Sequence, residues 1–133
     1  MSSNPLFVQT PIIATTSMSI ANTSRDGSGQ LYLVVTGSTN GTRIDWIQLK
    51  AEKTTVAGMI RFYINQSTSG SLAQNCLFDE IATSAITPSA TVVSYKYTYY
   101  PPRPIILPSG SYFWASTEKA TEDMNVIVFG GNF

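Results

Sequence analysis

No segment of this chain shows the three-to-four-residue apolar spacing of an amphipathic helix. The apolar residues instead form short runs rich in Val, Ile, Thr, Tyr and Phe, which favour strands. Clusters of Gly, Ser, Asn and Pro separate these runs at intervals of roughly ten residues, a spacing typical of sandwiches and barrels. We therefore expect about eight strands, at residues 11–21, 30–36, 42–51, 56–66, 72–83, 91–100, 111–117 and 124–129, with a short additional run at 105–107.

The chain length allows one hydrophobic core, because 133 residues is a normal size for a single domain. We divide it into an extended N-terminal arm at 1–10 and one domain at 11–133. Strands that each bury one face close a core as two packed antiparallel sheets. The expected fold is all-β, a single antiparallel β-sandwich that is jelly-roll-like. Strand spacing leaves other sandwich topologies open, and the run 72–83 also allows a helix.

The sequence contains no histidine. This excludes Ser-His-Asp and Cys-His nucleophilic machinery as well as histidine-ligated zinc. It also contains neither a phosphate-binding loop nor a dinucleotide fingerprint. Glu118, Glu122 and Asp123 fall near one turn, for which we prefer a solvated turn over an ion site, and an ion site over catalysis. We predict that the protein is not an enzyme and binds no cofactor or metal.

Charged residues make up only 12% of the chain, and eight basic residues balance eight acidic ones. The basic residues are scattered, whereas nucleic acids require a basic patch, so we expect no nucleic-acid partner. Asp45 is expected to pair with Arg43 or Arg61 across strands. The sequence shows no signal peptide and no apolar stretch near the ~20 residues of a membrane span, which predicts synthesis in the cytosol and no membrane partner. We interpret the single cysteine, Cys76, as a small buried hydrophobe.

A segment of tyrosines and prolines at 95–104 combines large rings with a rigid backbone. Strand alternation puts Tyr95, Tyr97 and Tyr99 on one side and Tyr100 on the other. Tyrosine and arginine are enriched in the cores of protein interfaces. The rings can therefore form an interface, fill the sandwich core, or make a platform for a glycan. The candidate interface residues of this segment are Tyr97, Tyr99, Tyr100 and Arg103.

The arm carries three consecutive apolar residues, Leu6, Phe7 and Val8. Such residues near a terminus either add to an exposed sheet edge, of a neighbouring subunit or of their own domain, or remain frayed. We favour docking on a neighbouring subunit, which makes all three candidate interface residues. The two tryptophans, Trp46 and Trp114, are by contrast expected in the core.

Several segments together form a recognisable pattern of strand and turn residues, at 40–51 (NGTRIDWIQLKA), 55–62, 107–110, 115–117 and 125–133 (NVIVFGGNF). The pattern spans roughly residues 30–133 and resembles small virion proteins encoded among the head and tail genes of tailed bacteriophages. The arm and the tyrosine segment are not part of the resemblance.

The resemblance implies a jelly-roll-like domain, often oligomeric, that decorates or cements the capsid or lies on the tail. Our leading hypothesis is a capsid decoration or cement protein located in the virion after synthesis in the host cytoplasm. The implied partners are further copies of the chain in a homotrimer, because jelly rolls in shells commonly associate around three-fold axes, and the major capsid protein or other virion proteins. The alternative is a tail, fibre or baseplate component that binds a host-surface glycan.

Overall fold

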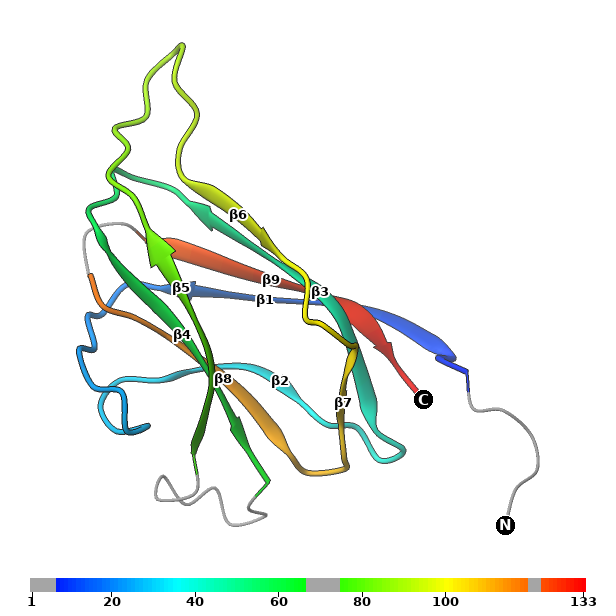
Figure 1. The fold of residues 1–133 in the computed structure, drawn as a ribbon. Helices are drawn as coiled ribbons and strands as arrows, with labels where there is room; N and C mark the ends of the chain where they lie inside the picture. Colours follow the sequence, from blue (N-terminus) through cyan, green and yellow to red (C-terminus); the bar gives the residue numbers. More distant parts are fainter. Residues whose placement is uncertain (1–6, 67–74, 120–122) are drawn as a thin grey trace.

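The computed structural model describes residues 7–66, 75–119 and 123–133. These residues form two antiparallel sheets packed against each other, which confirms the expected all-β sandwich (Figure 1). No helix among them is long and apolar enough to span a membrane. The nine strands of this described part are β1 Thr10–Met18, β2 Tyr32–Thr36, β3 Thr42–Ala51, β4 Gly58–Asn65, β5 Cys76–Thr83, β6 Lys96–Tyr99, β7 Ile105–Leu107, β8 Tyr112–Thr117 and β9 Met124–Asn132.

The two sheets have the strand order of a jelly roll. The first sheet contains β1, β9, β3 and β6 in that order, with β7 also paired to β3, and the second contains β2, β8, β4 and β5. Along the chain, β1 pairs with β9, β2 with β8, β3 with β6 and β7, and β4 with β5. The chain is thus one long antiparallel hairpin rolled into two sheets, as in other jelly rolls.

The strand bounds differ from expectation mainly between β5 and β7. β6 begins at Lys96, because residues 84–95 form a connection that projects beyond the sandwich (Figure 1). Prolines at 101, 102 and 104 then separate β6 from β7. Proline cannot donate a ladder hydrogen bond, so one edge of the first sheet is made of two short strands. The last strand continues beyond the expected end at residue 129 and reaches Asn132.

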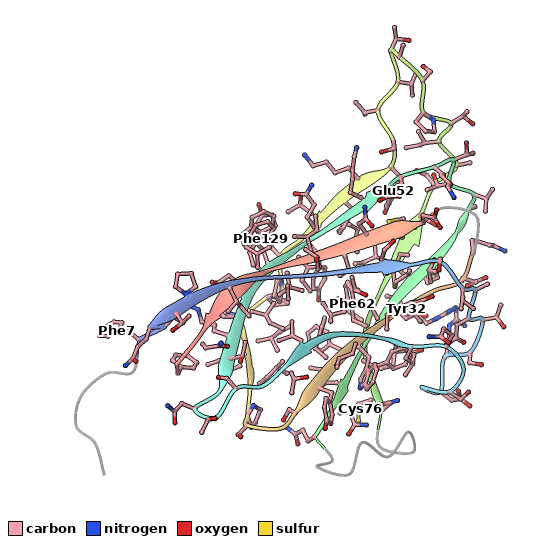
Figure 2. The ribbon with its side chains drawn as sticks, turned by 180° about the vertical axis from the view of Figure 1, so that it is seen from behind. Phe7, Tyr32, Glu52, Phe62, Cys76 and Phe129 are labelled. Carbon is pink, nitrogen blue, oxygen red and sulfur yellow. The ribbon has the colours of Figure 1, made fainter. Side chains whose placement is uncertain are left out.

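The hydrophobic core lies between the two sheets. Phe62 of β4 is fully buried there and packs against Phe113 of β8, with ring centroids 5.4 Å apart (Figure 2). Alternate residues of each central strand point into this space, as one-sided burial requires. The other core side chains of the central strands β3, β4, β8 and β9 are Ile44, Ile47, Leu49, Ala51, Ile60, Ala115, Met124, Val126 and Val128.

A buried arginine organises the outer face of the second sheet. Arg61 of β4 is only 2% exposed, and its guanidinium donates to Glu80 Oε1 at 2.8 Å and to Glu118 Oε2 at 3.0 Å. Arg25, from the connection between β1 and β2, donates to the same Glu80 oxygen at 2.9 Å. A buried charge is tolerated only when it is paired in this way. The cluster therefore joins the β1–β2 connection and residue 118 to the sheet.

We predict that Glu80→Gln lowers the unfolding free energy more at neutral pH than in acid. The hydrogen bonds from Arg61 and Arg25 hold the pKa of Glu80 below its ordinary value. A carboxyl with a lowered folded-state pKa stabilises the fold above its unfolded pKa, and this contribution is lost as the pH falls through the folded pKa. Urea denaturation should show a clear loss of unfolding free energy at about pH 7 and a much smaller one at about pH 3.

The matched control for this measurement is Glu52→Gln. Glu52 is exposed and forms no ion pair with a described residue. Its Oε1 accepts a hydrogen bond from Asn125 Nδ2 at 3.0 Å, which the amide oxygen of glutamine can also accept. Its replacement should leave the unfolding free energy nearly unchanged at both pH values. An equal effect of Glu80→Gln at the two pH values would contradict the role of this carboxylate.

Candidate interaction surface

The two sheets differ in how far their outer faces are covered. On the second sheet, Tyr63 of β4 points outward but is fully buried, and its hydroxyl donates to the carbonyl of Ser24 at 3.1 Å in the β1–β2 connection. On the first sheet, Ile13 and Tyr100 are 67% and 69% exposed. The second sheet also presents apolar side chains on this side, but its Leu33 and Leu77 are only 43% and 40% exposed. The first sheet therefore carries the more exposed apolar side chains.

Four residues form a continuous row across the outer face of the first sheet, and we call Ile13, Phe129, Trp46 and Tyr100 the aromatic row. Ile13 of β1 lies opposite Phe129 of β9, and Phe129 lies opposite Trp46 of β3. Tyr100 follows β6, whose Tyr99 is opposite Ile47 of β3. Partners in a ladder point to the same face, so the row extends from one edge of the sheet to the other.

Ring contacts connect the three aromatic members of the row. The rings of Trp46 and Phe129 stack with centroids 4.0 Å apart and planes 8° apart. The ring of Tyr100 is 6.1 Å from that of Trp46, at an angle of 31°. Figure 2 shows Phe129 on the side of its strand away from the core. Such pairs add about 0.5–1.5 kcal/mol beyond area burial, so the row is a pre-ordered surface.

A β-bulge places Trp46 on the outer face, which corrects our expectation that it lies in the core. The pairing of β3 with β9 shifts register between Ile44 and Trp46. Regular alternation from Ile44 would point Trp46 inward, but the extra residue, Asp45, turns it outward. Gly130 lies opposite the bulge, and a Cβ there would be 1.8 Å from the carbonyl oxygen of Arg43. Glycine is required at this approach of the two backbones.

The aromatic row itself carries no charge, and the charges on the same face lie beside it. Arg43 Nε forms an ion pair with Asp45 Oδ1 at 2.8 Å. This confirms Arg43 as the expected partner of Asp45, although the pair forms within β3 and not across strands. On the other side, Lys50 and Lys96 are directly opposite each other, and Lys50 Nζ donates to the carbonyl of Ser94 at 3.2 Å.

The tyrosine segment divides between core and surface. Tyr99 is buried, and its hydroxyl donates to Asp79 Oδ2 at 2.7 Å; burial and this carboxylate raise the pKa of Tyr99. Tyr99 is therefore a core residue and not part of an exposed contact surface. Tyr97 is opposite Leu49, toward the core side, but it is 44% exposed because β6 is an edge strand. Tyr100 lies on the side opposite Tyr99, as alternation predicts, and this is the outer side of the sheet.

Arg103 lies in the connection between β6 and β7. It is exposed and forms no ion pair or hydrogen bond with a described residue. A shallow cleft of about 400 Å³ beside it is lined by Phe78, Pro102, Arg103, Pro104 and Ile105.

The described end of the arm docks on its own domain. The backbone N–H of Gln9 donates to the carbonyl of Asn132 at 2.9 Å. Val8 is half-buried against Gly131, where a Cβ would lie 2.0 Å from Val8 Cγ1. Phe7 is 71% exposed, and Leu6 lies outside the described residues. Contact of Leu6, Phe7 and Val8 with a neighbouring subunit therefore stays a prediction.

One exposed apolar site was not found from the sequence. Val92 and Val93 are 47% and 78% exposed in the projecting connection between β5 and β6. Ser89 and Val92 exchange backbone hydrogen bonds there, at 2.9 and 3.4 Å. The break at Pro88 indicated a turn, but the β-branched residues after it suggested that a strand starts at 91.

Two further residues, Cys76 and Trp114, do not lie in the core as the sequence predicts. Cys76 is exposed rather than buried, and Trp114 is half-buried on the outer face of the second sheet.

The described acidic residues of the turn before β9 are engaged in ion pairs. Glu118 accepts from Arg61, as described, and Asp123 forms an ion pair with Lys53. Glu122 lies outside the described residues. Within those residues, no group of three or more metal-binding side chains comes together.

No protein-family model and no curated protein matches this sequence. The aromatic row is the strongest candidate because it is rigid, uncharged and exposed at both ends.

We predict that removal of the hydroxyl lowers the unfolding free energy at Tyr99 but hardly changes it at Tyr100. Tyr99→Phe removes the donor to Asp79 and should lower the unfolding free energy by about 1–3 kcal/mol. Tyr100→Phe removes a hydroxyl from an exposed ring and should change it by less than about 0.5 kcal/mol. Denaturant titration of both variants measures the difference. Equal losses would show that Tyr99 is not held in the core by this bond.

Proposed function

We propose that this chain is a structural virion protein of a tailed bacteriophage, a capsid decoration or cement protein that stabilises the head through subunit–subunit packing. The observation that carries the proposal is the exposed aromatic row across the first sheet. The sequence resemblance supports the assignment to a virion, and the jelly-roll fold agrees with it, although a fold alone does not define a function.

The aromatic row suits a packing role for energetic reasons. Burial of apolar surface contributes roughly 25 cal/mol per Å², and no charge in the row has to be desolvated first. The stacked Trp46 and Phe129 are already ordered, so little side-chain entropy is lost on binding. A specific interface typically buries ~1,600 Å² in total. Many copies on one shell would multiply modest individual contacts through multivalency.

The charged side chains support a role based on contact and not on chemistry. Arg61, Glu80 and Glu118 hold one another under the β1–β2 connection. Arg43 pairs with Asp45, and Lys53 pairs with Asp123. Carboxylates engaged in such structural pairs are poor candidates for general acids or bases. We propose a non-enzymatic protein whose partners are copies of itself, in a homotrimer, and the major capsid protein or other virion proteins.

The exposed ring of Tyr100 favours one alternative function. Sugars stack on exposed aromatic faces, and Tyr100 is 69% exposed beside Trp46. In this alternative the chain is a tail, fibre or baseplate component that recognises a host-surface glycan. Its location in the particle would differ, because a receptor-binding protein lies on the tail.

We predict that Ile13→Ser combined with Tyr100→Ser weakens attachment to the particle at least tenfold, a loss of about 1.4 kcal/mol. Both residues are the exposed ends of the aromatic row, so the fold should be unaffected. The measurement is the occupancy of the chain on purified particles, by quantitative mass spectrometry. Val92→Ser with Val93→Ser is the matched control, since it removes exposed apolar side chains away from the row, and it should keep full occupancy.

Cryo-electron microscopy of the particle locates the chain and separates the two functions. Density distributed over the head supports the cement protein. Density at the tail tip, with loss of glycan binding in Tyr100→Ser, supports the alternative. Absence of the chain from the particle would contradict both.

A further inference from the structure

The two sheets have four edges, and three of them carry features that prevent pairing with another strand. At one edge of the first sheet, β6 is four residues long and contains Lys96, and three prolines separate it from the three-residue β7. In the second sheet, β2 has five residues and a register shift between Leu33 and Val35. Short strands, lysine, proline and bulges are the usual protections of an edge.

The third protected edge, β5, carries charges as well as an irregular pairing. It carries Asp79 and Glu80, and its pairing with β4 shifts register between Phe62 and Tyr63. Asp79 points toward the core side, where it accepts from Tyr99. An inward-pointing charge of this kind also discourages a second strand from joining the edge.

The remaining edge, β1, has almost none of these protections. It is nine residues long and contains no charged residue. Its register with β9 runs without a shift from Thr10 opposite Asn132 to Met18 opposite Met124. Among the described residues it pairs with β9 alone. A long, regular, uncharged edge strand is a template for a further strand.

The position of Pro11 indicates which backbone groups of β1 are available. Proline has no N–H, and within an edge strand its nitrogen faces away from the neighbouring strand. Successive residues of a strand direct their backbone groups to opposite sides. Ile13, Thr15 and Ser17 have the same parity as Pro11, so their N–H and C=O groups point to the open edge. These three residues provide a donor and an acceptor each.

The inward-pointing side chains of β1 are also incompletely covered at the open edge. Ile12 and Ala14 point toward the core but remain half-buried, although their strand partners Gly130 and Val128 lie in the sheet interior. A further strand beside β1 would cover their exposed flank. On the outer face, Ile13 would bring the end of the aromatic row next to the added strand.

We propose that β1 pairs antiparallel with β1 of a second copy of this chain. A second copy fits because antiparallel pairing of identical strands is two-fold symmetric. The free backbone N–H and C=O groups of both β1 strands would then form hydrogen bonds with each other. The strand offers no charge by which a different partner could be selected, and its Thr15, Thr16 and Ser17 form favourable cross-strand pairs with Thr and Ser. The two first sheets become one continuous sheet.

This contact is separate from the proposed function. It depends only on the β1 edge, so it holds whether or not the chain belongs to a virion. It is also distinct from the three-fold association that the resemblance implies, because a two-fold contact gives dimers or joins one trimer to another.

The test is Thr15→Lys, which places like charges near each other across the two-fold axis. Thr15 is exposed, so the fold should persist, and circular dichroism and the unfolding midpoint verify this. Analytical ultracentrifugation should show a concentration-dependent even stoichiometry for the unaltered chain and a dissociation constant at least tenfold higher for Thr15→Lys. Thr36→Lys on the protected β2 edge is the matched control and should associate like the unaltered chain.

A cross-link provides a second, independent readout. In a Cys76→Ser background, which removes the exposed native thiol, Thr15→Cys should form a covalent dimer with a short bismaleimide, whereas Thr36→Cys should not. A chain that stays monomeric at millimolar concentration would overturn the proposal. So would a trimer that Thr15→Lys leaves unchanged.

Discussion

The pairing of β3 with β9, and the bulge within it, is the constraint on which the surface of this protein depends. These two strands form the centre of the first sheet and supply much of the core, including Ile47 and Val128. At the bulge, one extra residue in β3 reverses the side on which the following side chains emerge. Trp46 therefore leaves the core and stacks on Phe129. Gly130 makes this possible, because any side chain there would meet the backbone of β3.

The two layers of the sandwich have different roles as a consequence. The outer face of the second sheet is covered in part by the β1–β2 connection. Arg61 donates to the carbonyl of Asn22 in that connection, and Tyr63 donates to the carbonyl of Ser24. Both of these polar side chains have partners there. The outer face of the first sheet has no comparable cover over Ile13 and Tyr100, and its central row is apolar. Exposed apolar rows of this kind are uncommon on monomers and are typical of surfaces that bind another protein.

The outer face and the β1 edge of the first sheet can contribute to the same association with a partner. Ile13 belongs both to the aromatic row and to the unprotected β1 edge. Edge pairing would satisfy backbone groups, which gives orientation, while the outer face would bury apolar area, which gives affinity. Low overall charge fits this arrangement, because a chain with 12% charged residues has few groups that repel its own copies.

The sequence by itself determined the class of fold, because period-two patterns and turn residues are local properties. Most strand positions and the placement of Tyr99 and Tyr100 on opposite faces followed from it. Only the tertiary structure decided which aromatic residues form a surface. The bulge at Asp45 changes the parity of β3 without any local signal, so Trp46 could not be placed from alternation. The exposure of Cys76 and the burial of Tyr99 depend in the same way on which strands lie at the edges, and that is a consequence of how the whole chain rolls up.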